Sequence, residues 1–171
     1  MPLPSSATLV LGLGNILLMD EGVGVRAMEA FEAQWTVPDR VSVVDGGTCG
    51  MDMLDLIASH DHLIAVDAVK TGAPPATTLV LRGEEVPAYF KGKLSPHQLG
   101  LCDLLAALRL QDAAPRTVTL VGCVPLALGT GLMLSPEVEA TVPDMVERIV
   151  GELRRLGVEP APRHGAAPEA P

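Results

Sequence analysis

The sequence predicts a three-layer α/β fold, in which a twisted, mostly parallel five-stranded sheet lies between helices. Short apolar segments alternate along the chain with longer segments of helical spacing, which is the pattern of repeated strand–helix units. The short segments are apolar almost throughout, as in parallel strands that are covered on both faces. The five predicted strands lie at residues 8–12, 41–44, 63–66, 77–82 and 118–123.

Four further segments predict helices. In the first of them Val23, Ala27 and Ala30 recur at the spacing of one helix face, which gives that helix an apolar side. The four predicted helices cover residues 23–35, 50–59, 96–110 and 136–156.

Two of these helices have a clear start signal. Ser95 precedes Pro96 and is followed three residues later by Gln98, which fits a capping box. Ser135 and Pro136 repeat the Ser-Pro start, and the serine is expected to cap the last helix with its side chain.

The third and fourth predicted strands are joined by a short connection, residues 67–76. A crossover between parallel neighbours needs a dozen residues or more, usually with a helix. These two strands are therefore predicted either to form an antiparallel pair or to be one strand with a bent extension.

Length and composition predict one domain. The chain has 171 residues, of which 48% are hydrophobic, so a sizeable core is available. The domain is predicted to cover residues 1–157. Residues 158–171 are rich in proline, alanine and glycine and are expected to be a disordered tail.

Charge and aromatic content argue against binding to nucleic acid. The net charge is −9, and aromatic residues make up 2% of the chain. A nucleic-acid site would need a basic stripe or rings on which bases can stack. The first apolar run is interrupted by glycines and has no basic residue before it, unlike a signal peptide or a membrane span. The three cysteines form no CxxC pair, and we expect a cytoplasmic protein.

Acidic residues follow the first three predicted strands. Glu21 comes shortly after the first, Asp45 follows the second in an Asp-Gly-Gly segment, and Asp67 ends the third. His97 lies in the first turn of a helix whose start should face the same sheet edge. Ligands of open α/β sheets bind at the carboxyl ends of the strands. Carboxylates and an imidazole suit a divalent metal such as nickel or zinc, and three protein ligands leave coordination positions open for reaction.

Each candidate also has a structural alternative. Asp20 or Glu21 could cap the first helix, Asp45 could form a turn, and His97 could be a partly exposed first-turn residue. Asp67 is harder to explain in this way, because an ionised carboxylate at the end of a buried strand needs a partner. The remaining histidines, His60, His62 and His164, are expected to be ordinary surface residues, and Cys49, Cys102 and Cys123 small core residues.

The glycine-rich segment after the first strand does not fit a dinucleotide site. Gly12 and Gly14 give the first two glycines of that fingerprint, but Leu17 stands where the third belongs. The chain also lacks the GxSxG and HExxH motifs of other hydrolases.

Several motifs, in order, resemble those of the hydrogenase maturation endopeptidases. The resemblance starts with the segment from Leu11 to Gly24 and continues with Asp45-Gly46-Gly47-Thr48-Cys49-Gly50 and Val66-Asp67-Ala68. It ends with Ser95-Pro96-His97-Gln98-Leu99, Gly122-Cys123-Val124-Pro125 and the last helix start. It extends over residues 8–156, nearly the whole chain.

This resemblance implies a function. Enzymes of this family remove a C-terminal extension from the large-subunit precursor of a [NiFe] hydrogenase, after its metal centre has been loaded. Glu21, Asp67 and His97 match the family's nickel ligands and would be its catalytic residues, with Asp45 as a further catalytic candidate. The nickel would arrive with the substrate, and another divalent ion can occupy the site. The family implies a monomer with a phosphorylase/hydrolase-like fold.

Two other functions remain open on the sequence. One is a non-enzymatic nickel-binding chaperone of the same assembly pathway, which would share the ligand set. The other is a nucleotide-binding enzyme, which Leu17 disfavours.

Overall fold

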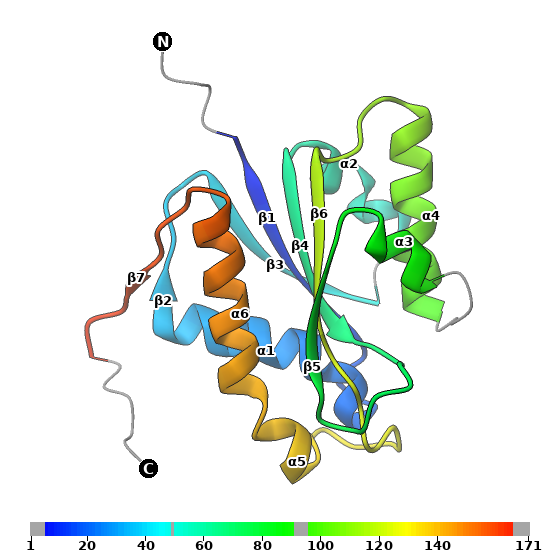
Figure 1. The fold of residues 1–171 in the computed structure, drawn as a ribbon, viewed down its shortest axis with the longest axis vertical. Helices are drawn as coiled ribbons and strands as arrows, with labels where there is room; N and C mark the ends of the chain where they lie inside the picture. Colours follow the sequence, from blue (N-terminus) through cyan, green and yellow to red (C-terminus); the bar gives the residue numbers. More distant parts are fainter. Residues whose placement is uncertain (1–5, 49, 91–95, 166–171) are drawn as a thin grey trace.

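A computed structural model describes residues 6–48, 50–90 and 96–165, without the side chains of residues 90 and 96–99. Its main sheet has the strand order β3-β1-β4-β6-β5 (Figure 1). The four strands β3, β1, β4 and β6 are parallel, and β5 is antiparallel to its neighbour. The strands are β1 (Thr8–Leu13), β3 (Val41–Gly47), β4 (His62–Ala68), β5 (Thr78–Arg82) and β6 (Thr117–Cys123).

Helices cover both faces of this sheet, as expected for a three-layer fold. Helices α1 (Val23–Gln34) and α6 (Val142–Arg155) lie on one side, and α2 (Leu54–Ala58), α3 (Glu85–Phe90) and α4 (Pro96–Leu110) on the other (Figure 1). Two buried clusters fill the layers. Val10 and Ile64 belong to the first, while Leu9 and Leu63 belong to the second. Successive strand residues thus point to opposite faces of the sheet, and both faces are buried.

The edge strand β5 corrects one expectation. It pairs with β6 and not with β4, so the third and fourth predicted strands are neither a hairpin nor one bent strand. The connection after β4 instead crosses the end of β6 and bonds to it on the way. The Val69 amide donates to the Cys123 carbonyl at 2.9 Å, and the Ala76 amide to the Val124 carbonyl at 2.8 Å. The chain then returns along β6 as an antiparallel edge, and the short helix α3, which was not expected, follows it.

The predicted last helix is two helices. Helix α5 (Pro136–Glu139) ends before α6 begins at Val142. Pro143 explains the break, because it has no amide hydrogen for the Glu139 carbonyl and its ring would clash with that carbonyl in a continuous helix. The short helix predicted at 50–59 is likewise a 3₁₀ turn, η2 (Met51–Met53), followed by α2.

The expected tail is ordered through residue 165, so the domain extends past residue 157. Val158 is buried in the cluster beneath α6. Strand β7 (Ala161–Pro162) pairs antiparallel with β2 (Trp35–Thr36). The Arg163 amide then donates to the Gln34 carbonyl at 2.8 Å. The proline- and alanine-rich composition suggested disorder for this segment. One buried valine and a few backbone hydrogen bonds nevertheless hold it against the domain. Residues 166–171 lie outside the described part of the chain.

Two histidines that were expected at the surface are half-buried and hydrogen-bonded. His62, the first residue of β4, bonds through Nδ1 to Thr117 Oγ1 at 2.7 Å and through Nε2 to Ser6 Oγ at 3.2 Å. His60 bonds to the Leu56 carbonyl and to Ser42 Oγ. Both lie at the amino end of the parallel strands, away from the edge where the candidate ligands are expected. Within the described residues, no helix has the length and apolar composition that a membrane crossing requires.

Replacing Val158 by alanine should lower the free energy of unfolding by about 1–3 kcal/mol, because it removes two buried methyl groups and leaves a cavity. Glu159→Ala, at the exposed neighbouring position, is the control and should change stability by no more than about 0.5 kcal/mol. Urea denaturation of the two variants measures the difference. Equal stabilities would show that residue 158 contributes nothing to the core.

His62 should make the protein less stable in mild acid. Burial lowers the pKa of His62 below its ordinary value of 6.5, and the nearby Asp61 offsets this only in part. The unfolded chain therefore binds a proton first, so stability falls as the pH drops through 6.5 toward the lower pKa of the folded state. We expect the free energy of unfolding of His62→Gln to change less between about pH 7.5 and pH 5.5 than that of the parent. Urea denaturation at both pH values measures these changes. Equal changes for the parent and His62→Gln would contradict the prediction.

Candidate functional site

The candidate site residues gather at the carboxyl edge of the sheet. Strand β1 runs into the 3₁₀ turn η1 (Met19–Gly22), which carries Asp20 and Glu21. Asp67 is the penultimate residue of β4. Because β1 and β4 are parallel neighbours, their carboxyl ends meet at the same edge. Glu21 and Asp67 therefore lie on neighbouring elements at this edge, and their roles as ligands and catalytic residues stay predictions.

Two glycines bring η1 close to the strand ends. A Cβ atom on Gly24, in the first turn of α1, would lie 2.1 Å from the Val66 carbonyl oxygen and 2.5 Å from that of Leu13. Gly14 has a φ of +119°, and its Cβ would lie 1.9 Å from the Glu21 carbonyl oxygen. Only glycine permits these approaches. The backbone of Glu21 therefore packs against the end of β1, while α1 begins directly beside the residue that precedes Asp67.

Asp67 is a buried carboxylate. Its residue is 1% exposed, and its Oδ1 accepts a hydrogen bond from the Ala68 amide at 2.8 Å. Tyr89 of α3 lies within reach of this charge. Burial first, and the negative charge of Asp67 second, raise the pKa of Tyr89 to about 12. The tyrosine hydroxyl donates to the Lys70 carbonyl at 2.5 Å, which ties α3 to the segment after β4.

Asp45 forms a turn in the described structure. It is exposed, and its Oδ1 accepts the Gly47 amide at 2.8 Å. Gly47 has a φ of +50°, and its carbonyl accepts the Gly14 amide at 2.8 Å. The Asp-Gly-Gly segment therefore shapes a turn that contacts the loop after β1, which agrees with the turn-forming alternative. A catalytic role for Asp45 stays a prediction.

His97 lies in the first turn of α4, and its side chain is outside the described residues. Helix α4 leads into β6, so it runs antiparallel to that strand and begins at the carboxyl edge (Figure 1). The backbone of residue 97 is therefore at the same edge as Glu21 and Asp67. Ser95, the expected cap, also lies outside the described residues. The described side chains contain no group of three His, Cys, Asp or Glu residues that could hold a metal, and His97 is not among them.

Asp20, which the sequence offered only as a possible helix cap, has a role that sequence reasoning missed. Its carboxylate is fully buried and accepts four hydrogen bonds from a segment more than one hundred residues away. The donors are the amides of Leu126 at 3.0 Å, Ala127 at 2.8 Å and Ser135 at 2.7 Å, and the Ser135 hydroxyl at 2.7 Å. Burial raises the pKa of Asp20, but these bonds lower it more, so the pKa lies below its ordinary value.

This network overturns two capping expectations. Asp20 lies inside the 3₁₀ turn and bonds the distant segment, so it does not cap the first helix. Ser135 makes no side-chain cap on α5, because its hydroxyl is bonded to Asp20. An acidic residue shortly after a strand is the only local signal for such a role, and the partners cannot be inferred from it.

The segment from β6 to α5 is thereby held against η1. We call residues 124–135 the β6–α5 loop. Besides the bonds to Asp20, the Gly131 amide donates to the Leu17 carbonyl at 2.9 Å. The Met19 amide donates to the Gly131 carbonyl, also at 2.9 Å. Glu21 therefore stands on a turn that is fixed on one side by the strand ends and on the other by this loop.

The two described cysteines are not activated nucleophiles. Burial raises the pKa of Cys102 to about 11 and also raises the pKa of Cys123, so both are thiols at neutral pH. Cys123 is fully buried, as expected for a core residue, and Cys102 is partly buried. A thiol is a poor nucleophile compared with a thiolate. Cys49 lies outside the described residues.

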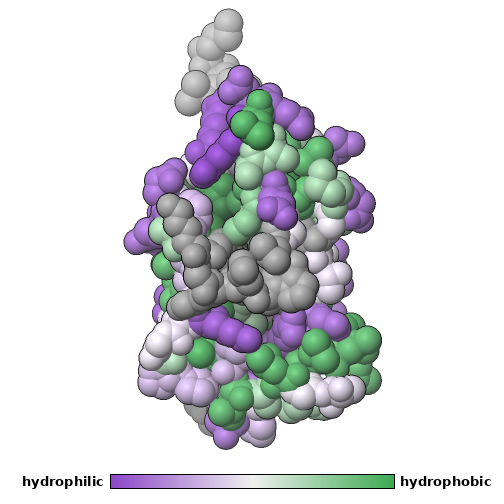
Figure 2. Space-filling view, turned by 90° about the vertical axis from the view of Figure 1, so that its right-hand side faces the viewer, coloured by the Kyte–Doolittle hydropathy of each residue, from purple (hydrophilic) through white to green (hydrophobic). Residues whose placement is uncertain are grey.

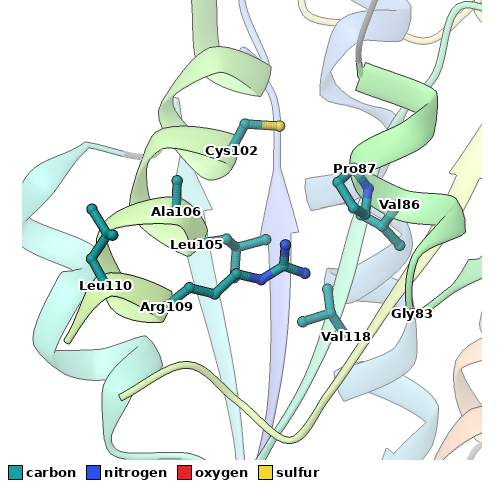
Figure 3. Close-up of a pocket in the computed structure, with 9 residues that line it drawn as sticks. All are labelled: Gly83, Val86, Pro87, Cys102, Leu105, Ala106, Arg109, Leu110 and Val118. Carbon is teal, nitrogen blue, oxygen red and sulfur yellow. The ribbon is translucent and has the colours of Figure 1, made fainter. Parts of the chain in front are cut away.

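An apolar cavity of about 420 Å³ lies at the opposite edge of the sheet. It is formed between α3, α4 and the start of β6, and the Arg109 side chain reaches into it from α4 (Figure 3). Val118, at the amino end of β6, lines it. The cavity contains none of the candidate ligands and is separate from the candidate site.

The sequence profile of hydrogenase maturation proteases matches residues 25–152. The hydrogenase 2 maturation protease of Escherichia coli strain K12 is 50% identical over 157 residues, which are 91% of this chain and 95% of that protein. The hydrogenase expression/formation protein HupD of Rhizobium leguminosarum bv. viciae is 41% identical and covers 97% of this chain, with 84% of its own length matched.

The chain belongs to the hydrogenase maturation protease family. It is therefore a peptidase, and the resemblance seen in the motifs is confirmed. The fold agrees as well. The maturating endopeptidase HybD of E. coli superimposes with a TM-score of 0.88 at 49% identity, over 92% of this chain and 98% of the other. HybD from Thermococcus kodakarensis gives a TM-score of 0.70 at 27% identity, over 86% of this chain and 98% of the other.

Asp20→Asn should destabilise the protein by about 2–4 kcal/mol, because an amide cannot accept four bonds and turns its own N–H groups toward other donors. Asp112→Asn is the matched control. Asp112 is exposed with a φ of +52°, a conformation that asparagine also adopts, so this change should leave stability unaltered. Urea denaturation gives both values. If the two variants were equally stable, the buried network would not hold the loop.

Proposed function

We propose that this peptidase removes the C-terminal extension of a metal-loaded [NiFe]-hydrogenase large-subunit precursor. In this proposal Glu21, Asp67 and His97 bind the nickel that the precursor carries, and this recognition precedes cleavage. The nickel is thus part of the substrate. The observation that carries the proposal is the meeting of Glu21 and Asp67 at one sheet edge, next to the start of α4.

The chemistry of these groups fits a divalent cation. Two carboxylates and one imidazole are oxygen and nitrogen donors of the kind that nickel and zinc accept. Asp67 is 1% exposed, and a buried carboxylate gains from a nearby cation. Glu21 is half-buried on a turn fixed on two sides, which suits a ligand that must be preorganised.

Hydrolysis by this chain is best explained without a cysteine nucleophile. The two described thiols are protonated at neutral pH, and Cys123 is buried. Ser135, in the loop held against η1, has its hydroxyl bonded to Asp20. A metal held by three protein ligands keeps positions open, where it can polarise a carbonyl group or activate water.

The same residues explain how cleavage could be restricted to precursor that already contains nickel. Without nickel, the two carboxylates and the imidazole share no cation with the precursor and cannot hold its scissile bond in place. With nickel in place, the carboxylates and the imidazole hold the loaded centre of the precursor and fix the bond to be cut relative to it. Only a loaded precursor is then processed. The free protein is expected to hold nickel weakly, because the remaining ligands belong to the substrate.

Asp67→Asn and His97→Ala should each slow processing of the nickel-loaded precursor by about 100-fold or more, because one of three ligands is lost. His97→Ala should change the free energy of unfolding by no more than about 1 kcal/mol. The mass of the large subunit, followed in time with purified proteins, measures the cleavage. His164→Ala, an exposed position near the end of the described chain, is the control and should process at the parental rate.

Three outcomes separate the parts of the proposal. If both ligand variants cleave at the parental rate, the assigned site is wrong. If the parent cuts precursor that lacks nickel as fast as loaded precursor, nickel is not the recognition element. If the parent binds loaded precursor but releases no peptide, this precursor is not the substrate that the peptidase cuts.

A further inference from the structure

Exposed apolar side chains are concentrated at the edge that carries the candidate site. Seven large hydrophobic side chains are exposed among the described residues. Leu110 lies at the end of α4, at the opposite edge of the sheet. The other six lie in the loops that follow β1, β3 and β6, and we call them the apolar rim. They are Leu17, Met51, Leu126, Leu128, Leu132 and Met133.

The β6–α5 loop supplies most of the apolar rim and carries no charge. Residues 124–135 contain no Asp, Glu, Lys or Arg, although 19% of the chain is charged. Met133 is 69% exposed and Leu132 is 60% exposed. Figure 2 shows hydrophobic side chains gathered along the lower part of the molecule, where this loop lies. A contiguous apolar surface of this kind marks a site of interaction with another molecule.

This loop cannot easily turn its apolar side chains inward. Its backbone is bonded to Asp20 through Leu126 and Ala127 at one end and through Ser135 at the other. In the middle, Gly131 pairs with Leu18. A loop that was free to move would bury its leucines against the protein. The hydrogen bonds of the β6–α5 loop instead keep its leucines exposed to water. Such preorganisation lowers the ordering cost of binding a partner.

The rim also borders a recess. Leu132 and Met133 form one wall of a cavity of about 440 Å³, whose other walls come from α1, α5 and the start of α6. Arg26 and Glu139 supply polar groups at this cavity. An apolar wall with a polar border is the arrangement of a protein interface.

The width of the rim indicates a folded partner. Met51 follows β3, and the β6–α5 loop follows β6, three strand positions away in the order β3-β1-β4-β6. Three strand spacings are about 14 Å, while a single extended peptide is only about 5 Å wide. A peptide that enters the site between these loops would cover part of the rim. A folded surface can cover all of it.

We propose that the apolar rim docks the folded body of the hydrogenase large-subunit precursor, apart from the C-terminal segment that is cut. This inference rests on the proposed function and adds a second contact to it. The partner surface carries large apolar side chains that pack against Leu126, Leu132 and Met133 on one side of the site and Met51 on the other. Docking of the body holds the chain end over Glu21 and Asp67.

Binding of two forms of the large subunit tests this docking. The first form is the nickel-loaded precursor, and the second is the same subunit ending at the cleavage point. The parent should bind both with similar affinity. The double variant Leu132→Gln/Met133→Gln and the single variant Met51→Gln should weaken binding of both forms, the double variant by about tenfold or more. In cleavage assays these variants should have a raised KM and an unchanged kcat.

Leu110→Gln is the matched control, because Leu110 is 89% exposed and lies at the far edge. It should bind both forms of the subunit like the parent. Thermal melts check that every variant is folded. Rim variants that bind both forms with parental affinity would overturn the docking surface, and so would a parent that fails to bind the truncated subunit. The proposed function fails by a different result, namely a parent that does not cleave the loaded precursor.

Discussion

The carboxylate of Asp20 is the interaction on which the functional edge depends. It is fully buried, and its cost of leaving water is offset by four donors that come from the β6–α5 loop. One residue further along the chain is Glu21, a candidate ligand. The same short turn therefore carries an acid for stability and an acid for chemistry. Asp20 fixes the turn through its bonds to the loop. Glu21 is therefore held at a defined position beside the end of β4.

Close backbone approach sets the other side of this arrangement. Gly24 lies where any side chain would meet the carbonyl oxygens of Val66 and Leu13, and Gly14 lies where it would meet that of Glu21. These contacts bring the start of α1 down onto the strand ends. Asp67, the residue after Val66, is 1% exposed. The site is therefore built from backbone packing at the edge of the sheet, with Glu21 placed by the turn η1 and Asp67 by the end of β4.

Carboxylates and an apolar loop lie at the same edge of the sheet, and each suits a different part of one substrate. The carboxylates of Glu21 and Asp67 suit a cation, while the uncharged β6–α5 loop suits an apolar protein surface. A peptidase that relied on the metal alone would hold its substrate at one point. A second contact several strand spacings wide fixes orientation as well, and orientation is what a reaction at a single bond requires. The apolar cavity lies at the opposite edge and is lined by neither carboxylate.

Much of the fold follows from local pattern. The apolar strands, the amphipathic first helix and the order of acids at strand ends are properties of short segments, so the sequence predicts a three-layer sheet and the edge where Glu21 and Asp67 meet. With one exception, the errors concern segments whose position depends on distant contacts. Pro143 breaks the last helix through its own ring, a local cause that the spacing of apolar residues hid. The position of β5 beside β6 depends on backbone bonds formed only after the chain has crossed the sheet.

The sequence by itself determined the fold class, the family and the chemical type of the candidate ligands, because periodicity and motifs are carried by neighbouring residues. Tertiary structure alone decided the long-range contacts of the polar residues. It placed Asp20 at the centre of the hydrogen bonds of the β6–α5 loop, with Ser135 as one of the donors. It also paired the segment after Val158 with β2. It also left the leucines of the β6–α5 loop in water. These outcomes depend on bonds between residues up to 131 positions apart in the chain, such as Glu32 and Arg163, and no local pattern encodes such a meeting.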